Sequence, residues 1–222
     1  MRRAAALTAV VPLLLLAGCS GDVAPEEGSA PVGDGGEPVP TALDQGYSAL
    51  DPGSVGEAEL TATLEDAAGR EIGVVGMDPG PEGTVVSVVL TDSGLEPGFH
   101  GLHVHAVGEC EVDSQSPSDP STTGDFLSAG AHIGADASDH PSHAGDLPPL
   151  LVTSTGGATL QVVTEGFTVD DVTDADGSAV VVHEGADDLA NIPERYAPEG
   201  PDEETLSGGD SGARAACGVL DG

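Results

Sequence analysis

Short runs of aliphatic and β-branched residues, separated by turn-forming residues, make up most of the sequence after about residue 56. Examples are AELTATL, EIGVVGM, TVVSVVLTD, GLHVHAV and DGSAVVVHE. Clusters of Gly, Pro, Asp and Ser lie between these runs and favour turns. No window of ten residues shows a convincing helical period. The pattern therefore predicts one all-β domain, an antiparallel sandwich or barrel, over residues 56–222.

The first 55 residues have a different composition. Residues 1–18 begin with two arginines and continue with an apolar run that is too short to span a bilayer, which predicts a secretory signal peptide. The segment LAGC at 16–19 resembles the bacterial lipoprotein box, in which Cys19 would be acylated after cleavage; a chance cysteine after an ordinary signal peptide is the alternative. Residues 19–55 are rich in Gly, Pro, Ala and acids and indicate a disordered linker.

These N-terminal features predict where the protein is found. We expect it to be exported and held by the lipid on Cys19 at the outer face of the cell membrane; whether part of it is released stays open. The chain carries 39 acidic residues against five arginines and no lysine, a formal charge of −34. So negative a surface argues against nucleic acid or an anionic lipid surface as a partner.

The three cysteines suggest one disulfide. If Cys19 is acylated, Cys110 and Cys217 remain as a pair, and an exported compartment favours a bond between them. In the chain-entropy model, a bond that closes a loop of roughly 100 residues contributes about 4 to 5 kcal/mol to stability. It would also tie the histidine-rich segment to the C-terminus.

Histidines gather in GFHGLHVHAVGEC, residues 98–110. Side chains alternate along a strand, so His103 and His105 should point to the same side, about 7 Å apart, and can reach one metal ion. His100 is separated from His103 by an odd number of positions, so in a regular strand its side chain would face the other way. Two ordinary surface histidines would show the same spacing, so this pair alone is weak evidence.

Two long polar segments, 111–149 and 188–213, interrupt the strand pattern. Loops of this length in a compact domain are usually functional or disordered. The first carries three histidines, His132, His140 and His143, which indicates function.

The histidine-containing segments also resemble a known family. GFHGLHVHAVGEC, SAGAHIG, HAGDLP, AVVVHEGADDL and GARAACGV occur in an order and at separations similar to those of copper,zinc superoxide dismutases, from about Gly56 to Gly222. The resemblance implies a Greek-key antiparallel β-sandwich or barrel with two long functional loops. It also implies an enzyme that converts superoxide to dioxygen and hydrogen peroxide by a copper redox cycle, and so protects the cell envelope.

The resemblance further implies two metal groups that share one bridging histidine. The copper ligands would be His103, His105, His132 and His183. The zinc ligands would be His132, His140, His143 and Asp146. Four imidazoles suit copper, whereas three nitrogens and one carboxylate suit tetrahedral zinc.

Other site residues follow from the same resemblance. Asp187 would accept hydrogen bonds from His103 and His140, and such partners fix the orientation of metal-binding rings. Arg214 would lie beside the substrate and act with His132 in catalysis. His100 would be a buried histidine that binds backbone and no metal.

The chain departs from the family in two ways that matter. Only two residues separate His140 from His143, fewer than usual, so we expect zinc to be held less securely than copper. The second long segment lacks the lysines that often attract the substrate anion.

Two other functions are compatible with parts of the sequence. A non-catalytic relative that buffers or delivers copper would keep the ligands without needing Arg214, and a zinc hydrolase would need a catalytic carboxylate that is not evident here. The sequence favours the enzyme and leaves open whether it forms a homodimer.

Overall fold

The computed structural model describes residue 50 and residues 52–222. The expected signal peptide, Cys19 and most of the expected linker lie outside these residues. The chain divides into two units, Met1–Tyr47 and Ser48–Gly222, and the description that follows concerns the second. In this described part, no helix has the length and apolar character needed to cross a membrane.

Strands account for most of the regular structure. The described strands are β1 (Leu60–Asp66), β2 (Glu71–Gly80), β3 (Gly83–Leu90), β4 (Gly98–His100), β5 (Leu102–His105), β6 (Ser114–Gln115), β7 (Thr123–Gly124), β8 (Leu150–Val152), β9 (Ala158–Thr164), β10 (Ala179–His183) and β11 (Arg214–Val219). The helical elements are short: α1 (Pro52–Val55), η2 (Leu127–Ala129), η3 (Val169–Val172) and α2 (Glu203–Gly208). The helix α1 falls at the end of the range expected to be linker, and its Val55 is buried.

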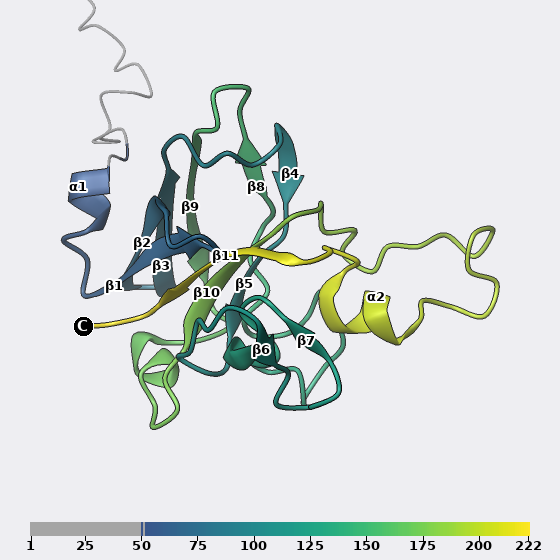
Figure 1. Cartoon of the computed structure of the whole chain (residues 1–222). Helices are drawn as coiled ribbons and strands as arrows, with labels where there is room; N and C mark the ends of the chain where they lie inside the picture. The colour runs from purple at the N-terminus through teal and green to yellow at the C-terminus, as the bar shows by residue number, and fades with distance from the viewer. Residues whose placement is uncertain (1–49, 51) are drawn as a thin grey trace, which may run out of the picture. The chain divides into compact units, whose positions relative to one another are not determined.

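Seven strands form one antiparallel sheet in the order β5-β10-β11-β1-β2-β3-β9, and β4 pairs with β8 in a second, two-stranded sheet. In Figure 1 the strands of the large sheet curve around one another, and α2 lies to one side of them. Neighbours distant in sequence, such as β1 and β11, require crossovers between the strands. The predicted all-β antiparallel fold is confirmed.

The strand β10 shows how the core is divided. All five of its residues are buried, and successive side chains point to opposite faces. Val180 and Val182 belong to the main apolar core, whereas Ala179 and Val181 belong to a smaller cluster near the disulfide. The strand is therefore covered on both faces, and its last residue, His183, reaches the site from inside the protein.

The outer edge of β5 is covered by the first long segment. Val104 donates its N–H to Gly145 O and accepts from Ile133 N at its own carbonyl, both at 2.9 Å, and Ala106 N donates to Ala131 O at 2.9 Å. These bonds hold the segment along the edge strand of the sheet. The histidines of the segment are thereby brought beside those of β5.

Both long segments contain more regular structure than their composition predicts. The first includes the β6–β7 pair and η2, and the second includes α2. Asp202 begins α2 by accepting from Thr205 N, and Gly209 ends it in the left-handed region. These short elements could not be predicted from a composition rich in Gly, Pro and acids, because each depends on one or two capping contacts.

Candidate metal centre

Three histidines project from paired strands. His103 lies opposite Val181 in the β5–β10 ladder, and His105 is two residues further along β5. A bulge between Val182 and His183 pairs His183 with Arg214 on β11. Bulges redirect side chains and are frequent beside active sites. The centroids of the His103 and His183 rings lie 4.9 Å apart, and all three histidines are buried.

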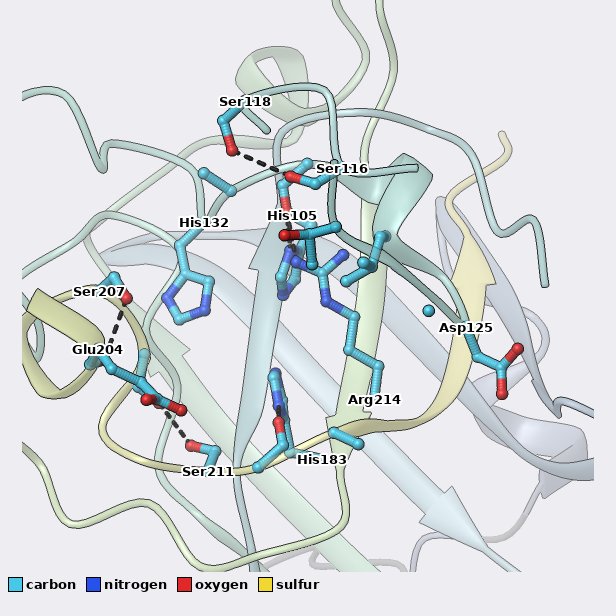
Figure 2. Close-up of a pocket in the computed structure, with 18 of the residues that line it drawn as sticks. His105, Ser116, Ser118, Asp125, His132, His183, Glu204, Ser207, Ser211 and Arg214 are labelled. Carbon is cyan, nitrogen blue, oxygen red and sulfur yellow. Dashed lines mark hydrogen bonds between the residues drawn. The ribbon is translucent and has the colours of Figure 1, made fainter. Parts of the chain in front are cut away.

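His132 joins this group from the first long segment. It forms an isolated β-bridge with His105, and its ring stacks on that of His103 with 4.0 Å between centroids. One nitrogen from each of His103, His105, His132 and His183 lies within 4.8 Å of the others. Figure 2 shows His105, His132 and His183 facing one common space.

The hydrogen bonds of the strand histidines are arranged as metal ligands require. One nitrogen of each ring donates: His103 Nε2 to Asp187 at 3.0 Å, His105 Nδ1 to Gly130 O at 2.9 Å and His183 Nδ1 to Gly212 O at 3.0 Å. The other nitrogen of each ring is buried without a hydrogen-bond partner. Buried polar atoms are rarely left unpaired, and metal-binding histidines typically donate their second nitrogen in this way. The group therefore fits a metal ion such as copper.

A second group converges on the carboxylate of Asp146. Its Oδ1 accepts from His132 Nδ1 at 2.8 Å, and its Oδ2 lies 3.1 Å from His140 Nδ1 and 3.3 Å from His143 Nδ1. His140 Nδ1 is buried and makes no hydrogen bond despite this short distance. Three nitrogens and one carboxylate are the ligands typical of tetrahedral zinc. The ligand atoms of His132, His140 and Asp146 lie within 4.8 Å of one another and of a nitrogen of His103, and His143 joins them through its contact with Asp146.

Asp187 links the two groups. Its Oδ2 accepts from His103 Nε2 at 3.0 Å, and its Oδ1 accepts from His140 Nε2 at 2.8 Å. Gly209 packs directly against this carboxylate in a left-handed conformation with φ of 61°, and a Cβ at that position would overlap Asp187 Oδ1. The glycine therefore both ends α2 and leaves room for the link.

Burial and charge act in opposite directions on the histidines. Burial lowers the pKa of His105 well below its usual value, that of His132 to about 4 and that of His183 to about 3. Burial also opposes the charged form of His140, but the neighbouring carboxylates of Asp146 and Asp187 outweigh it and raise the pKa of His140 to about 9. The rings of His105, His132 and His183 thus favour the neutral form that binds a metal.

Arg214 lines a pocket together with three of the four histidines, His105, His132 and His183. Its Nη1 donates to Phe126 O and its Nη2 to Gly130 O, both at 2.6 Å. Burial lowers the pKa of Arg214 to about 10, so the side chain stays charged at neutral pH. The pocket has a volume of about 610 Å³, and four exposed acids also line it, namely Asp125, Glu184, Glu204 and Asp210. Figure 2 shows the guanidinium of Arg214 directed toward His105 within this pocket.

The predicted disulfide between Cys110 and Cys217 is confirmed, with an S–S distance of 1.99 Å. His100 is buried, and its two ring nitrogens each lie 2.8 Å from a backbone carbonyl, of His183 and Glu96. His100 belongs to neither group of possible metal ligands. It ends β4, whereas His103 and His105 lie on β5, so alternation along one regular strand does not describe their relation.

The structure brings together every residue that the sequence placed in the two groups, and it adds three that the sequence did not indicate. Phe126 and Gly130 hold Arg214 through backbone carbonyls, which leave no mark in a sequence. Gly209 belongs to the pair SGGD, which suggests a helix end but not contact with Asp187.

An antiparallel β-fold in which a buried four-histidine group shares one ring with a histidine–aspartate group is that of a two-metal protein. Comparison with known proteins identifies which kind. The family model for copper/zinc superoxide dismutase matches residues 72–220. The chain belongs to the copper/zinc superoxide dismutase family, and it is an enzyme of that class, with copper and zinc as its metals and superoxide as its substrate.

Individual relatives agree. A superoxide dismutase [Cu-Zn] of Mycobacterium bovis is 40% identical over 191 residues, 83% of this chain and 78% of the relative. One from Mycolicibacterium paratuberculosis is 37% identical over 199 residues, 87% of this chain and 86% of the relative. The solved Cu/Zn superoxide dismutase from Brucella abortus is 28% identical, with a TM-score of 0.56, over 73% of this chain and 100% of that one.

Proposed function

We propose that His103, His105, His132 and His183 hold copper, that His132, His140, His143 and Asp146 hold zinc, and that His132 bridges the two and carries a proton during dismutation. The observation that supports this is the set of buried ring nitrogens left without hydrogen bonds, on His103, His105, His140 and His183. Among the residues that the structure describes, no other side-chain nitrogen or oxygen is left in this state.

The overall reaction takes two superoxide ions and two protons to one dioxygen and one hydrogen peroxide. Copper, when bound, supplies a one-electron redox couple, and zinc supplies a fixed positive charge that supports His132. The residues of the chain supply the geometry, the access for the anion and the proton.

His132 is placed to hold and pass on that proton. Its Nδ1 faces Asp146 and His143, while its ring stacks on His103 and lines the pocket. We infer that Nε2 holds a proton in one half of the cycle and gives it to the reduced substrate in the other. The second proton comes from water in the open pocket.

Arg214 is placed to orient the anion. Two carbonyls fix the guanidinium beside His105 and leave its charge at the pocket. Since the four acids at the pocket repel anions, Arg214, the one arginine that lines it, has to provide local attraction together with the bound metal ions.

The role assignments are tested by metal analysis and superoxide decay on the purified domain. His105→Ala should lose copper and activity together. Arg214→Ala should keep both metals and lose about tenfold or more in rate, because a removed orienting contact costs rate and not metal binding. Copper retained in His105→Ala, or an unchanged rate in Arg214→Ala, would contradict the corresponding role.

We further propose that the enzyme protects the cell envelope from superoxide, as an exported protein anchored by lipid on Cys19. The support is the N-terminal sequence alone. Labelling cells with a radioactive fatty acid should mark the wild-type protein and not Cys19→Ala, which should appear in the medium. Equal labelling of both would count against the anchor.

A further inference from the structure

Phe126 combines a buried ring with a backbone conformation that phenylalanine rarely adopts. Its φ is 62° and its ψ 15°, in the left-handed region, and its side chain is only 2% exposed. For a bulky residue such a conformation is an outlier, and outliers persist only where the surroundings enforce them. A glycine would fit this backbone without strain, so the phenylalanine ring must contribute something that glycine lacks.

The ring belongs to the small apolar cluster beside the disulfide. Its neighbours there are Ala129, Ala179, Val181 and Cys217, with Cys110 packed against them. The Cys110–Cys217 bond joins two segments 107 residues apart, so this cluster is covalently closed. The ring is therefore held by both the sheet and the disulfide.

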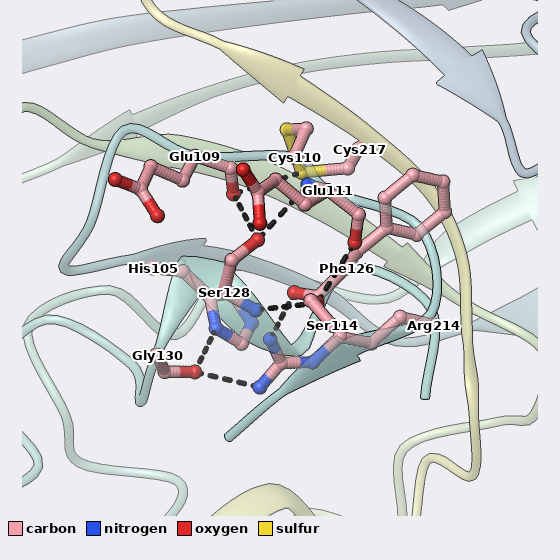
Figure 3. Close-up of a disulfide and its surroundings, with 10 residues drawn as sticks. All are labelled: His105, Glu109, Cys110, Glu111, Ser114, Phe126, Ser128, Gly130, Arg214 and Cys217. Carbon is pink, nitrogen blue, oxygen red and sulfur yellow. Dashed lines mark hydrogen bonds between the residues drawn. A yellow bond between two sulfur atoms is a disulfide. The ribbon is translucent and has the colours of Figure 1, made fainter. Parts of the chain in front are cut away.

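The backbone of Phe126 is held at both ends of the residue. Its N–H donates to Glu111 O at 2.8 Å, and its carbonyl accepts from Arg214 Nη1 at 2.6 Å. Two serines brace the adjoining turn: Ser128 Oγ accepts from Glu111 N at 2.9 Å, and Ser114 Oγ accepts from Ser128 N at 3.0 Å. Figure 3 shows this network running from the disulfide, past Phe126, to Arg214 and Gly130.

We propose that Phe126 is a positioning residue for Arg214. The ring, packed against the disulfide, holds the backbone in its left-handed conformation, and that conformation directs the carbonyl at the guanidinium. Together with Gly130 O, which also accepts from His105, it fixes the cation beside the copper-side histidines. The proposal rests on the role of Arg214 in the proposed function, but it concerns where the side chain is held and can be tested separately.

The experiment measures how fast phenylglyoxal modifies each arginine of the metal-loaded protein, by peptide mass spectrometry. Phe126→Gly removes the ring at a position that suits glycine. We expect modification of Arg214 to become about tenfold faster, since a guanidinium that opens more often reacts more often. Phe126→Leu keeps apolar bulk and should give about a twofold increase.

Three internal controls separate positioning from general loosening. Phe167→Ala removes another ring that is 3% exposed, in the main core and away from Arg214, and should leave the Arg214 rate unchanged. The rate of modification of Arg70, and likewise that of Arg195, should be the same in every variant as in the wild-type protein. An unchanged Arg214 rate in Phe126→Gly, or equal acceleration at all three arginines, would overturn the proposal.

Two further outcomes are decisive. If Phe126→Gly does not fold, Phe126→Leu is compared with Phe167→Ala, and equal Arg214 rates in these two variants overturn the proposal. The superoxide rate of Phe126→Gly should fall by about threefold to tenfold. Faster modification with an unchanged superoxide rate would support the positioning by Phe126 and contradict the catalytic role proposed for Arg214.

Discussion

The two metal groups are built from different kinds of structure. His103, His105 and His183, the strand histidines, stand on β5 and β10, whose ladder fixes their backbones. His140, His143 and Asp146, which we propose as zinc ligands and name the loop ligands, come from a segment without a long strand or helix. His105 and His183 are oriented by backbone carbonyls, whereas the loop ligands are oriented largely by one another through Asp146.

This difference indicates how each site depends on its metal. A ladder of backbone hydrogen bonds persists without a ligand, so the strand histidines should be almost preformed. A loop that is held by contacts among its own ligands loses those contacts when any one is removed, and metal binding then has to supply the ordering. We therefore expect the zinc group to be the more sensitive to change, and three experiments test this contrast.

The largest effect should come from Asp146→Ala. This change removes the one carboxylate that contacts His132, His140 and His143, so zinc affinity should fall by more than about 100-fold. Copper affinity should fall by less than about tenfold, because the strand histidines keep their ladder. Both affinities can be measured by competition with chelators.

Asp136→Ala is the matched control, since Asp136 is an exposed acid of the same segment and should leave both affinities unchanged. A loss of copper affinity as large as that of zinc would show that the strand histidines are no more preformed than the loop ligands.

An intermediate effect is expected from Gly209→Ala. The new Cβ would displace Asp187, which orients His140 of the loop and His103 of the strand. We expect about a tenfold loss of zinc affinity and a smaller loss for copper, because the backbone of His103 is fixed independently. Isothermal titration of the metal-free protein with each ion measures the two losses.

Gly69→Ala separates the clash from backbone strain. Gly69 has a φ of 74°, like the 61° of Gly209, but a Cβ there would meet nothing within 4 Å. The backbone strain should therefore cost about 1 kcal/mol of stability in both variants, and the clash with Asp187 adds to it only in Gly209→Ala. If Gly69→Ala weakened zinc as much as Gly209→Ala, the contact with Asp187 would not be the cause.

The smallest effect should be that of salt, which acts only where a group opens to solvent. His105, His132 and His183 line the pocket together with four exposed acids, whereas His140, His143 and Asp146 do not line it. Raising the ionic strength from about 0.05 M to about 0.5 M should screen those acids and raise kcat/KM by up to about twofold. Pulse radiolysis measures this rate directly.

Glu204→Gln, at the pocket, should reduce the salt effect, whereas Glu65→Gln, an exposed acid that does not line it, should not. A steep fall in rate with salt would mean that attraction by Arg214 outweighs the surrounding acids.

The sequence predicted the strand side of the site for a physical reason. Alternation along β5 places His103 and His105 together wherever the strand forms. The loop ligands could be assigned only through the resemblance, because no local pattern says where His140 or Asp146 will come to lie. The bulge at His183 and the strained backbone of Phe126 escaped prediction because each depends on packing between segments far apart in the sequence.

The covered edge of β5 has a consequence for the behaviour of the protein in solution. The bonds from Val104 and Ala106 to the metal-bearing segment occupy backbone groups that would otherwise be free at the end of a sheet. Free edges recruit strands from other molecules and lead to aggregation. The segment that carries His140, His143 and Asp146 thus also guards against self-association, and a change that detached it from β5 would expose this edge to other molecules.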